Sequence, residues 1–408
     1  MGKRTWANFV AFLLAGCSQA GDPSRLWVWA HEGREVERRI LSRQVARFQQ
    51  QHPGMGLKLT FLPEGSYNSQ VQAAALAGQL PDILEFDGPL LYRYVWQGCL
   101  RPLGRLLNDS ARTNLLPSLE RQGTFRGRLY SVGVFDSGLA LYGRKSLLES
   151  VGARLPSRPE EAWTIAQFER ILKDLARADE DGQVLDLKLN YQGEWLTYAF
   201  SPVLVSAGAD LRHLDRPEAA RALTLLQEWS EHGLIDPNLD DAAFVEGRVA
   251  LSWVGHWEYP RYAERWGGDL CLIPLPNFGI GSRSGQGSWN WAITSRCGSP
   301  RRAAEFLNFL LEDAQVLEMT AGNGAVPGTL SAIAKSPLYQ KGGPLRLFSQ
   351  QLLEGWCAPR PATPAYPFVT SVFQQAVRDI VHGAPVKKVL QSAAQDIRQD
   401  ELDNEDYR

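Results

Sequence analysis

The chain has 408 residues and a formal net charge of −2, and 44% of its residues are hydrophobic and 22% are charged. This is the composition of a globular protein, and it excludes a disordered tail, a collagen-like repeat and a polytopic membrane protein. The near-neutral charge argues against a nucleic-acid binder, which would need a basic surface to match phosphates, and the length predicts two or three domain-sized units.

The N-terminal segment has the features of a secretion signal that ends at a lipid-bearing cysteine. Two basic residues precede an apolar run over residues 6–14, which is too short for a membrane-spanning helix of about 20 residues. Small residues then lead to Cys17 in an order that resembles the bacterial lipoprotein box. We expect residues 1–16 to be a signal peptide and residues 17–24 to be a linker that Cys17 anchors to the membrane through its lipid. An ordinary signal peptide is the alternative.

The part of the chain after residue 24 begins with alternating strands and helices. Apolar runs predict strands at 26–29, 57–61 and 82–86, and the helical spacing of apolar residues predicts helices over 34–51 and 68–77. This β-α-β-α-β order predicts a parallel sheet with right-handed crossover connections.

Polar side chains follow each of these three strands. They are His31 and Glu32 after the first strand, Glu64 and Ser66 after the second and Asp87 after the third. In open α/β sheets ligands bind beyond the carboxyl ends of the strands, so these residues are candidates for a binding site. A turn or capping role is the alternative for each of them, and above all for Ser66.

The rest of the chain continues the α/β pattern. Further strands are predicted at 138–142, 248–254, 269–273 and 289–294. Helix starts are indicated by a capping box at 164–167, by Pro217 in a first helical turn, and by Ser299 and Pro300, from which one long helix is expected to run to Gly322. Two final helices carry apolar faces over 369–380 and 386–397.

Signatures of metal, nucleotide and nucleophilic chemistry are missing from the sequence. The six histidines are isolated, there is no GxSxG motif, and the glycine-rich segment 138–146 has its lysine one position away from that of a phosphate-binding loop. We therefore expect no metal, no cofactor and no catalysis. A pair of catalytic carboxylates for glycoside hydrolysis stays open as a possibility, because two such residues can be far apart in the sequence and adjacent in the fold.

Four cysteines remain besides Cys17. An even number in an oxidising compartment fits two disulfides with three possible pairings, and free buried thiols are the alternative. The four are Cys99, Cys271, Cys297 and Cys357.

Short motifs lie in a characteristic order along the chain. They include 78–83 (GQLPDI), 244–250 (FVEGRVA), 299–310 (SPRRAAEFLNFL) and 360–367 (RPATPAYP). Their order resembles that of the extracellular solute-binding proteins of ABC importers, and most closely the carbohydrate-binding group that includes maltose-binding and glycerol-phosphate-binding proteins. Gly133 departs from the family pattern, which usually has proline there.

The resemblance implies an α/β fold with two lobes, each a mostly parallel sheet flanked by helices, and a ligand cleft between them. Residues 25–134 plus 290–328 would form the first lobe and residues 135–289 plus 329–408 the second. It further implies a monomer in the bacterial cell envelope that closes on a sugar by a hinge motion and presents it to the membrane permease of the importer.

Tryptophan is abundant, with 13 residues, and an indole can cover the apolar face of a sugar ring. The resemblance places Trp257 and Trp289 at the cleft as stacking residues, and Trp253 is a weaker candidate. Glu32 and Asp87 would accept hydrogen bonds from hydroxyl groups.

Secondary polar candidates complete the predicted site. Arg360 would donate to hydroxyls or pair with a phosphate, and a structural salt bridge is the alternative. The remaining members of this group are His31, Ser66, Asp136 and Ser137.

Three alternatives to a sugar-binding protein stay open. The first is a binder of glycerol phosphate or another small polyol phosphate. The second is a lipid-anchored glycosidase, and the third is an interaction lipoprotein without a small ligand.

Overall fold

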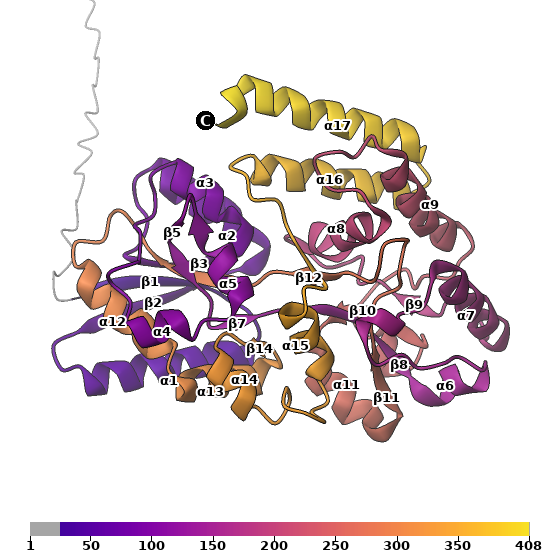
Figure 1. Cartoon of the computed structure of the whole chain (residues 1–408), viewed down its shortest axis with the longest axis horizontal. Helices are drawn as coiled ribbons and strands as arrows, with labels where there is room; N and C mark the ends of the chain where they lie inside the picture. Colours follow the sequence, from indigo (N-terminus) through magenta and orange to yellow (C-terminus); the bar gives the residue numbers. More distant parts are fainter. Residues whose placement is uncertain (1–24, 408) are drawn as a thin grey trace, which may run out of the picture.

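The computed structural model of the chain describes residues 25–407, which form two lobes lying side by side (Figure 1). Each lobe contains a β-sheet with helices around it, so the predicted two-lobed α/β fold is confirmed. The predicted signal peptide, linker and lipid-bearing Cys17 lie outside the described residues. Within residues 25–407, no helix has the length and apolar character needed to cross a membrane.

A five-stranded sheet forms the centre of the first lobe. Its strands, in the order in which they lie side by side, are β2 (Gly56–Leu62), β1 (Arg25–His31), β3 (Ile83–Asp87), β13 (Trp289–Ile293) and β6 (Ser131–Val132). As predicted, β1 is parallel to both β2 and β3. β13 returns from late in the chain and is antiparallel to β3 and β6.

The first crossover helix, α1 (Glu35–Gln51), follows the predicted apolar spacing. Its buried apolar residues are Ile40, Leu41, Val45 and Phe48. The Glu37 carboxylate accepts a hydrogen bond of 2.8 Å from the backbone N–H of Arg34 at the start of the helix. This bond satisfies a donor that the first turn would otherwise leave unpaired.

A four-stranded sheet forms the centre of the second lobe. Its strands, in spatial order, are β11 (Leu270–Ile273), β8 (Leu139–Arg144), β10 (Leu251–Gly255) and β9 (Leu185–Asp186). β8 is antiparallel to β10 and β11, and only the pair of β10 and β9 is parallel. The prediction of a mostly parallel sheet is therefore wrong for this lobe. Because β8 leads away from the first lobe, its antiparallel neighbour β10 ends next to the start of β8.

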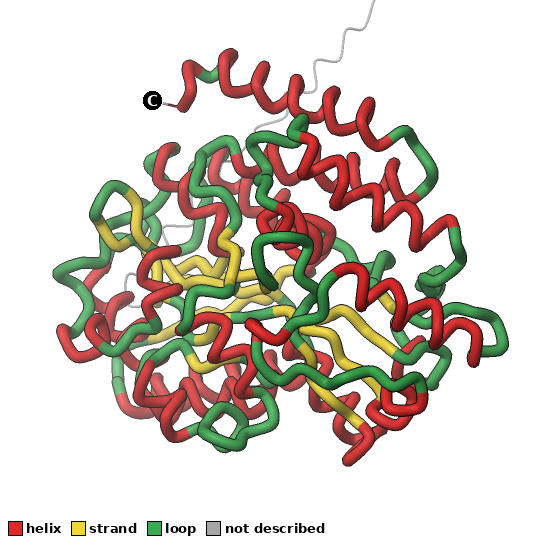
Figure 2. The backbone as a smooth tube through the Cα atoms, turned by 45° about the vertical axis from the view of Figure 1, so that its right-hand side comes forward, coloured by secondary structure: helices red, strands yellow, loops and turns green. Residues whose placement is uncertain are grey.

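The chain passes between the two sheets twice in its first three hundred residues, after β6 and before β13. Figure 2 shows the strands in yellow, with loops and helices around them. Short backbone pairings hold these passages together: β7 (Phe135–Asp136) pairs with β14 (Val326–Pro327), and β12 (Ser284–Gln286) pairs with β15 (Cys357–Pro359). The strands of each sheet fall within the predicted lobes, except that β13 begins at Trp289. The exact lobe boundaries stay a prediction.

Helices and short strands complete the two lobes. The helices are α2 (Glu64–Leu76), α3 (Leu91–Trp96), α4 (Asp109–Thr113), α5 (Pro117–Gln122), α6 (Lys145–Ser150), α7 (Ile165–Ala178), α8 (Trp195–Ala207), α9 (Pro217–Glu231), α10 (Ala243–Glu246), α11 (Tyr259–Trp266), α12 (Pro300–Leu310), α13 (Asp313–Asn323), α14 (Leu330–Lys335), α15 (Arg346–Leu353), α16 (Tyr366–Val381) and α17 (Val386–Asp403). A hairpin of β4 (Thr124–Phe125) and β5 (Arg128–Leu129) and five 3-10 turns are the remaining elements of the described chain: η1 (Gly88–Leu90), η2 (Pro159–Glu161), η3 (His256–Glu258), η4 (Gly267–Asp269) and η5 (Glu405–Tyr407).

Most predicted helix starts are confirmed, but one predicted helix is split. The capping box of Thr164 and Gln167 opens α7, and Pro217 begins α9. The prediction of a single helix over residues 299–322 is wrong, because the chain forms the two helices α12 and α13 there. Glu312 between them has an extended backbone (φ −65°, ψ 141°), and its carbonyl accepts the first hydrogen bonds of α13.

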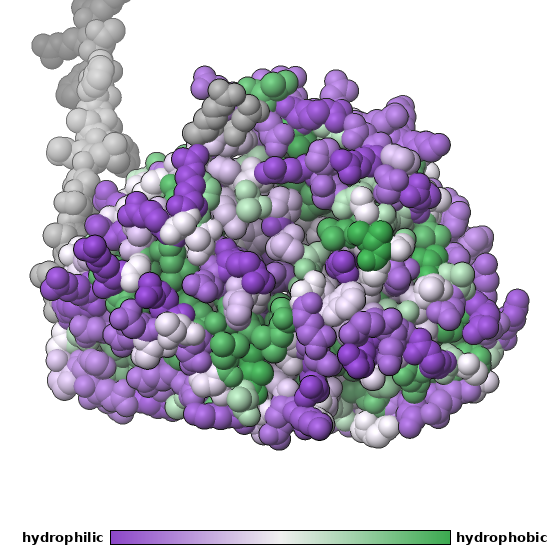
Figure 3. All heavy atoms as spheres, viewed as in Figure 1, coloured by the Kyte–Doolittle hydropathy of each residue, from purple (hydrophilic) through white to green (hydrophobic). Residues whose placement is uncertain are grey.

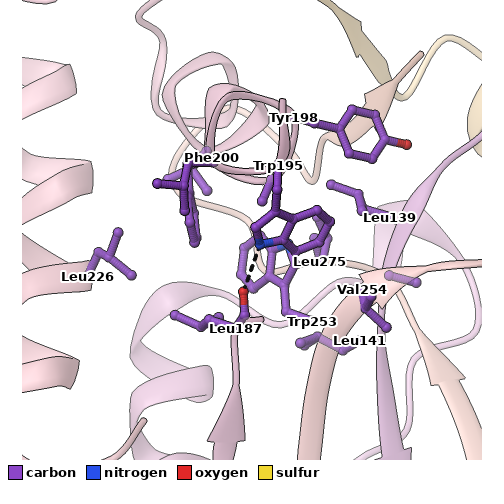
Figure 4. Close-up of a cluster of buried hydrophobic side chains, with 14 of the residues drawn as sticks. Leu139, Leu141, Leu187, Trp195, Tyr198, Phe200, Leu226, Trp253, Val254 and Leu275 are labelled. Atoms are coloured by element: carbon purple, nitrogen blue, oxygen red, sulfur yellow. Dashed lines mark hydrogen bonds between the residues drawn. The ribbon is translucent and has the colours of Figure 1, made fainter. Parts of the chain in front are cut away.

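Each lobe has its own hydrophobic core, and hydrophilic side chains dominate the face shown in Figure 3. In the second lobe, α8 packs its apolar side chains over the sheet, where Trp195, Phe200 and Trp253 form a close cluster (Figure 4). The helices α16 and α17 lie outside α8 and α9 (Figure 1).

The cysteines of the described chain are unpaired. Cys99 and Cys297 are buried, Cys271 and Cys357 are partly buried, and all four are free thiols. Of the two possibilities that the sequence leaves open, the structure therefore has the buried thiols and not the disulfides.

Candidate ligand-binding site

A cavity of about 440 Å³ lies between the lobes. This volume is in the range of small-molecule binding sites. Its lining comes from the loops that follow β1, β3 and β10, from the start of α2 and α8, and from the segments that pass between the lobes. The carboxyl ends of the parallel strands therefore face the cavity, as expected for an α/β sheet.

The wall from the first lobe is built on a stacked pair of rings. His31 ends β1 and Trp289 begins β13, and their rings lie parallel with centroids 3.8 Å apart. Tyr67 packs edge-on against the same indole at 5.2 Å. Trp289 is half-buried, so the pair supplies a flat aromatic surface to the cavity.

A buried carboxylate fixes the orientation and charge of His31. Its Nδ1 lies 2.7 Å from the Glu85 carboxylate, which also accepts a hydrogen bond from the His31 backbone N–H. Burial alone would lower the pKa of His31, but Glu85, with smaller contributions from Glu37 and Glu64, raises it to about 9. His31 is therefore a cation at neutral pH, with an adjacent anion.

The wall from the second lobe is aromatic. Trp257 follows β10, and its indole contacts Trp195 edge-on at 6.0 Å and Tyr198 at 6.2 Å between ring centroids. Tyr191 in turn packs edge-on against Trp195, with the two ring centroids 5.2 Å apart.

Gly255 is the residue that lets Trp257 take this position. A Cβ atom at Gly255 would lie 2.0 Å from the Trp257 ring, which is closer than any van der Waals contact. The last residue of β10 must therefore lack a side chain for the indole to lie across it.

The inner end of the cavity contains an ion pair between the lobes. Arg360 binds both carboxylate oxygens of Asp87 through two hydrogen bonds of 2.6 Å, and both residues are buried. Its Nη1 also lies 3.7 Å from Glu194, whose carboxylate accepts hydrogen bonds from Tyr366 and Thr370. Burial and the nearby Asp87 raise the pKa of Glu194. We call the Arg360–Asp87 pair the inner contact.

A second ion pair joins the lobes at Arg34, the residue before α1. Its guanidinium binds the carboxylate of Glu258, which is fully buried and which also accepts hydrogen bonds from Tyr191 at 3.0 Å and Arg261 at 2.9 Å. The Arg34 side chain is 39% exposed. We call the Arg34–Glu258 pair the outer contact.

The structure brings six of the ten predicted ligand-binding residues to the cavity. They are His31, Asp87, Ser137, Trp257, Trp289 and Arg360. For Arg360, the structure has the salt bridge that the sequence leaves as an alternative. Arg360 thus already binds both oxygens of the Asp87 carboxylate.

Trp253 and Asp136 are predicted site residues that the structure buries elsewhere. Trp253 is 1% exposed and packs in the second-lobe core beside Phe200 and Phe278, because it faces α8 and not the cavity. Asp136 is fully buried where the chain passes between the lobes, and accepts hydrogen bonds from Ser118 and from the backbone of Ser137. Burial raises the pKa of Asp136 to about 7, in spite of these hydrogen bonds.

Glu32 and Ser66 also lie outside the cavity lining. Side chains alternate along an extended chain, so Glu32 does not face the same way as His31, and its exposed carboxylate lies 3.9 Å from Arg38. The helix α2 begins at Glu64 and not at the predicted residue 68, so Ser66 lies in its first turn, where its hydroxyl accepts a hydrogen bond from Gln70. Ser66 is therefore neither in the cavity lining nor at the cap position of this helix, which Pro63 occupies.

Several lining residues were missed by the sequence analysis. Glu64 stands with Ser66 at the predicted end of the second strand, but only Ser66 is among the predicted ligand contacts. Tyr191, Glu194, Trp195 and Tyr198 lie on a loop and a helix far from any predicted strand end, and nothing in their spacing indicates a site. Asp241 and His256 also line the cavity.

The described residues contain no group of three or more metal-ligating side chains. The carboxylates of the cavity are instead distributed around an aromatic interior. Such a site can cover the apolar face of a ring and satisfy polar groups at its edge.

Comparison with known proteins identifies the relatives of this chain. Residues 43–344 match the family described as bacterial extracellular solute-binding protein. The mannitol-binding protein of Pseudomonas aeruginosa is 30% identical over 121 residues, which are 29% of this chain and 27% of that protein. The match thus spans about a quarter of the relative's length.

Solved structures share the fold over nearly the whole chain. The cyclic alpha-maltosyl-1,6-maltose binding protein of Arthrobacter globiformis has a TM-score of 0.73 at 22% identity, over 92% of this chain and 98% of that one. The GacH receptor of Streptomyces glaucescens, solved unliganded and with acarbose, has a TM-score of 0.77 at 19% identity, over 94% and 99% of the two chains. At these identities the likeness shows the fold.

Proposed function

Because the chain belongs to the family of bacterial extracellular solute-binding proteins, we propose that it binds a sugar or a related polyol in the cavity between its lobes. The observation that carries this proposal is the cavity itself, in which the half-buried indoles of Trp257 and Trp289 come from different lobes and polar groups surround them. A pyranose or polyol has apolar C–H groups and a hydroxyl rim that match this distribution.

The proposed mechanism is closure of the lobes on the ligand. A ligand that contacts both indoles binds the closed arrangement better than an open one, and so shifts the protein toward it. The closed protein then delivers the sugar to the permease of an ABC importer. We propose that it acts as a monomer, without catalysis.

The location follows from the family and from the N-terminal sequence. We propose that the protein works outside the cytoplasmic membrane, and that the lipoprotein-like segment ending at Cys17 supplies its anchor. Two of the similar proteins, named above, bind mannitol and a cyclic maltosaccharide, and this supports a hydroxyl-rich ligand here.

The proposal is tested by screening the full chain in a thermal-shift assay against monosaccharides, disaccharides, polyols and sugar phosphates. We expect at least one sugar or polyol to raise the melting temperature without being consumed, and to change tryptophan fluorescence. If product were released the protein would be an enzyme, and if no compound bound the proposal would fail.

The aromatic wall is tested with Trp257→Ala. We expect the dissociation constant for the ligand found in the screen to rise more than tenfold, or about 1.4 kcal/mol, because the stacking surface of the second lobe is lost. Trp96→Ala is the matched control, since Trp96 is an exposed tryptophan outside the cavity. Equal affinities of the two variants would remove Trp257 from the site.

A further inference from the structure

Three segments of the first lobe concentrate positive charge. They are residues 95–108, residues 124–130 and residues 294–302, which together contain seven arginines and no aspartate or glutamate. Over the whole chain acidic residues outnumber basic ones by 45 to 43. The three segments therefore differ in charge from the rest of the protein.

The direction of the strands places these segments at the end of the sheet opposite the cavity. β13 begins at Trp289 in the cavity and leads to residues 294–302 at the other end of the sheet. β6 is antiparallel to β13, so residues 124–130, which precede β6, lie at that same end. The neighbouring β1 has seven residues and ends in the cavity at His31, so the two ends of the sheet are about 20 Å apart.

Hydrogen bonds show that the three segments adjoin one another. The Arg101 guanidinium donates to the backbone carbonyls of Ser295 at 3.1 Å and Cys297 at 3.4 Å. The backbone N–H of Leu103 donates to the carbonyl of Leu129 at 2.7 Å. Residues 95–108 thus lie against both of the other segments.

Five arginines of these segments are exposed and carry unbalanced charge. Within residues 25–407 none of the five forms an ion pair with a carboxylate, whereas the exposed Arg39 and Arg43 of α1 pair with Glu35 and Glu318. Such a set of like charges attracts an anionic partner from outside the chain. We call these five residues the arginine face: Arg105, Arg126, Arg128, Arg296 and Arg301.

The described chain also starts at this end of the first lobe. Arg25 begins β1 and pairs with Gly56, and the neighbouring Gly54 carbonyl accepts a hydrogen bond of 2.7 Å from Arg302 in α12. In Figure 1, α12 lies on the side of the first lobe away from the second lobe. Residues 17–24 connect Cys17 to this point, and a chain of this length spans at most about 28 Å. A lipid on Cys17 would therefore hold the arginine face near the membrane surface.

We propose that the arginine face binds the anionic phospholipid headgroups of the membrane to which the protein is anchored. The guanidinium group is suited to this role, because it can donate two parallel hydrogen bonds to the oxygens of a phosphate. Attraction between charges in physiological salt extends about 8 Å, so the short tether is needed to bring the two surfaces within range. The cavity, at the opposite end of the sheet, stays away from the lipid. This inference goes beyond ligand binding, and it rests on the proposed function only for the anchor at Cys17.

The experiment measures how the full chain with Cys17→Ala partitions onto vesicles in a co-sedimentation assay. The substitution removes the site of lipid attachment, so binding reports on the protein surface. One vesicle preparation contains phosphatidylcholine alone, and the other contains about 30% phosphatidylglycerol, which is anionic. We expect at least tenfold tighter binding to the anionic vesicles, and loss of this preference when salt is raised from about 0.05 M to about 0.5 M. Equal binding to the two preparations would overturn the inference.

The arginine face is tested with the triple variant Arg126→Gln, Arg128→Gln, Arg296→Gln in the same background. We expect its partitioning onto the anionic vesicles to fall at least tenfold, because each basic residue near such a surface strengthens binding about fivefold. The apolar run over residues 6–14 is present in every form compared, so it cannot cause the difference.

The matched control removes three exposed arginines from the second lobe. It carries Arg170→Gln, Arg212→Gln and Arg216→Gln, so the net charge of the chain changes by the same amount. We expect this control to bind the anionic vesicles within about twofold of its parent. Equal losses from the two triple variants would show that only the net charge matters, and would overturn the role of the arginine face.

Ligand binding by the same variants separates this inference from the proposed function. We expect both triple variants to keep the melting temperature of their parent and its shift with the sugar or polyol found in the screen. A chain that binds this ligand but shows no preference for anionic vesicles would overturn the inference alone. A chain that prefers anionic vesicles but binds no compound of the screen would overturn the proposed sugar binding alone.

Discussion

The inner and outer contacts both join the two lobes through an arginine and a carboxylate, but they differ in burial. In the inner contact both Arg360 and Asp87 are buried and two parallel hydrogen bonds connect them. In the outer contact Arg34 is 39% exposed, and its partner Glu258 has Arg261 and Tyr191 as further partners. We therefore expect the same pair of residue types to be essential in one place and dispensable in the other, depending on what remains when one member is removed.

Removal of Arg360 should give the largest effect. Arg360→Ala leaves the buried Asp87 without a counter-ion and takes a neighbouring charge from Glu194, so we expect the free energy of unfolding to fall by about 3–5 kcal/mol. Urea denaturation followed by circular dichroism measures this change. The Asp87→Leu, Arg360→Met double variant removes both charges and should recover most of the loss, whereas a double variant as unstable as Arg360→Ala would contradict the explanation.

A pH titration separates both contacts from the His31–Glu85 pair. The arginines keep their charge up to high pH, whereas His31 has a pKa raised from 6.5 to about 9 in the folded protein. A raised pKa stabilises the folded state fully below pH 6.5, and this contribution is lost as the pH rises through about 9. We expect a loss of up to about 3 kcal/mol in the free energy of unfolding across this window.

The control for this prediction is the same pH titration on the His31→Gln variant. The stability difference between the wild-type chain and this variant should shrink as the pH rises from 6 to about 9.5, since both then lack the imidazolium charge. A difference that stays constant with pH would mean that the pKa of His31 is the same in the folded and the unfolded protein.

Removal of Arg34 should give the smallest effect. Arg34→Ala leaves Glu258 with its remaining partners, so we expect the free energy of unfolding to fall by about 1 kcal/mol, and by less in high salt because the pair is partly exposed. Arg39→Ala is the control, since Arg39 lies in the first turns of α1, the helix that Arg34 precedes, and forms an exposed pair with Glu35. A loss from Arg34→Ala as large as that from Arg360→Ala would remove the distinction between the two contacts.

Much of the framework of the fold can be predicted from local patterns. Apolar runs predict β1 and β3, alternation predicts β2, and helical spacing predicts α1. These signals are local, because the pattern of buried residues along an element depends on the type of the element and on whether one or both of its faces are covered. The helix split at Glu312 and the antiparallel direction of β8 were not predicted. Both depend on how segments distant in the chain pack against one another.

The residues of the candidate site are likewise only partly predictable from the sequence. The strand-end rule and the family resemblance select His31, Asp87, Trp257 and Trp289, which all line the cavity. The same reasoning also selects Glu32 and Trp253, which do not, because a shift of one residue along a strand reverses the direction of the side chain.

The amino-acid sequence alone predicts the alternation of strands and helices, the first candidate residues and the resemblance to a family of binding proteins, because these follow from spacing and from short motifs. The pairing of Arg360 with Asp87 and of Arg34 with Glu258 is visible only in the folded structure. The physical reason is that ion pairing, burial and unsatisfied hydrogen bonds depend on distances between atoms that are hundreds of residues apart in the chain, and no local pattern encodes those distances.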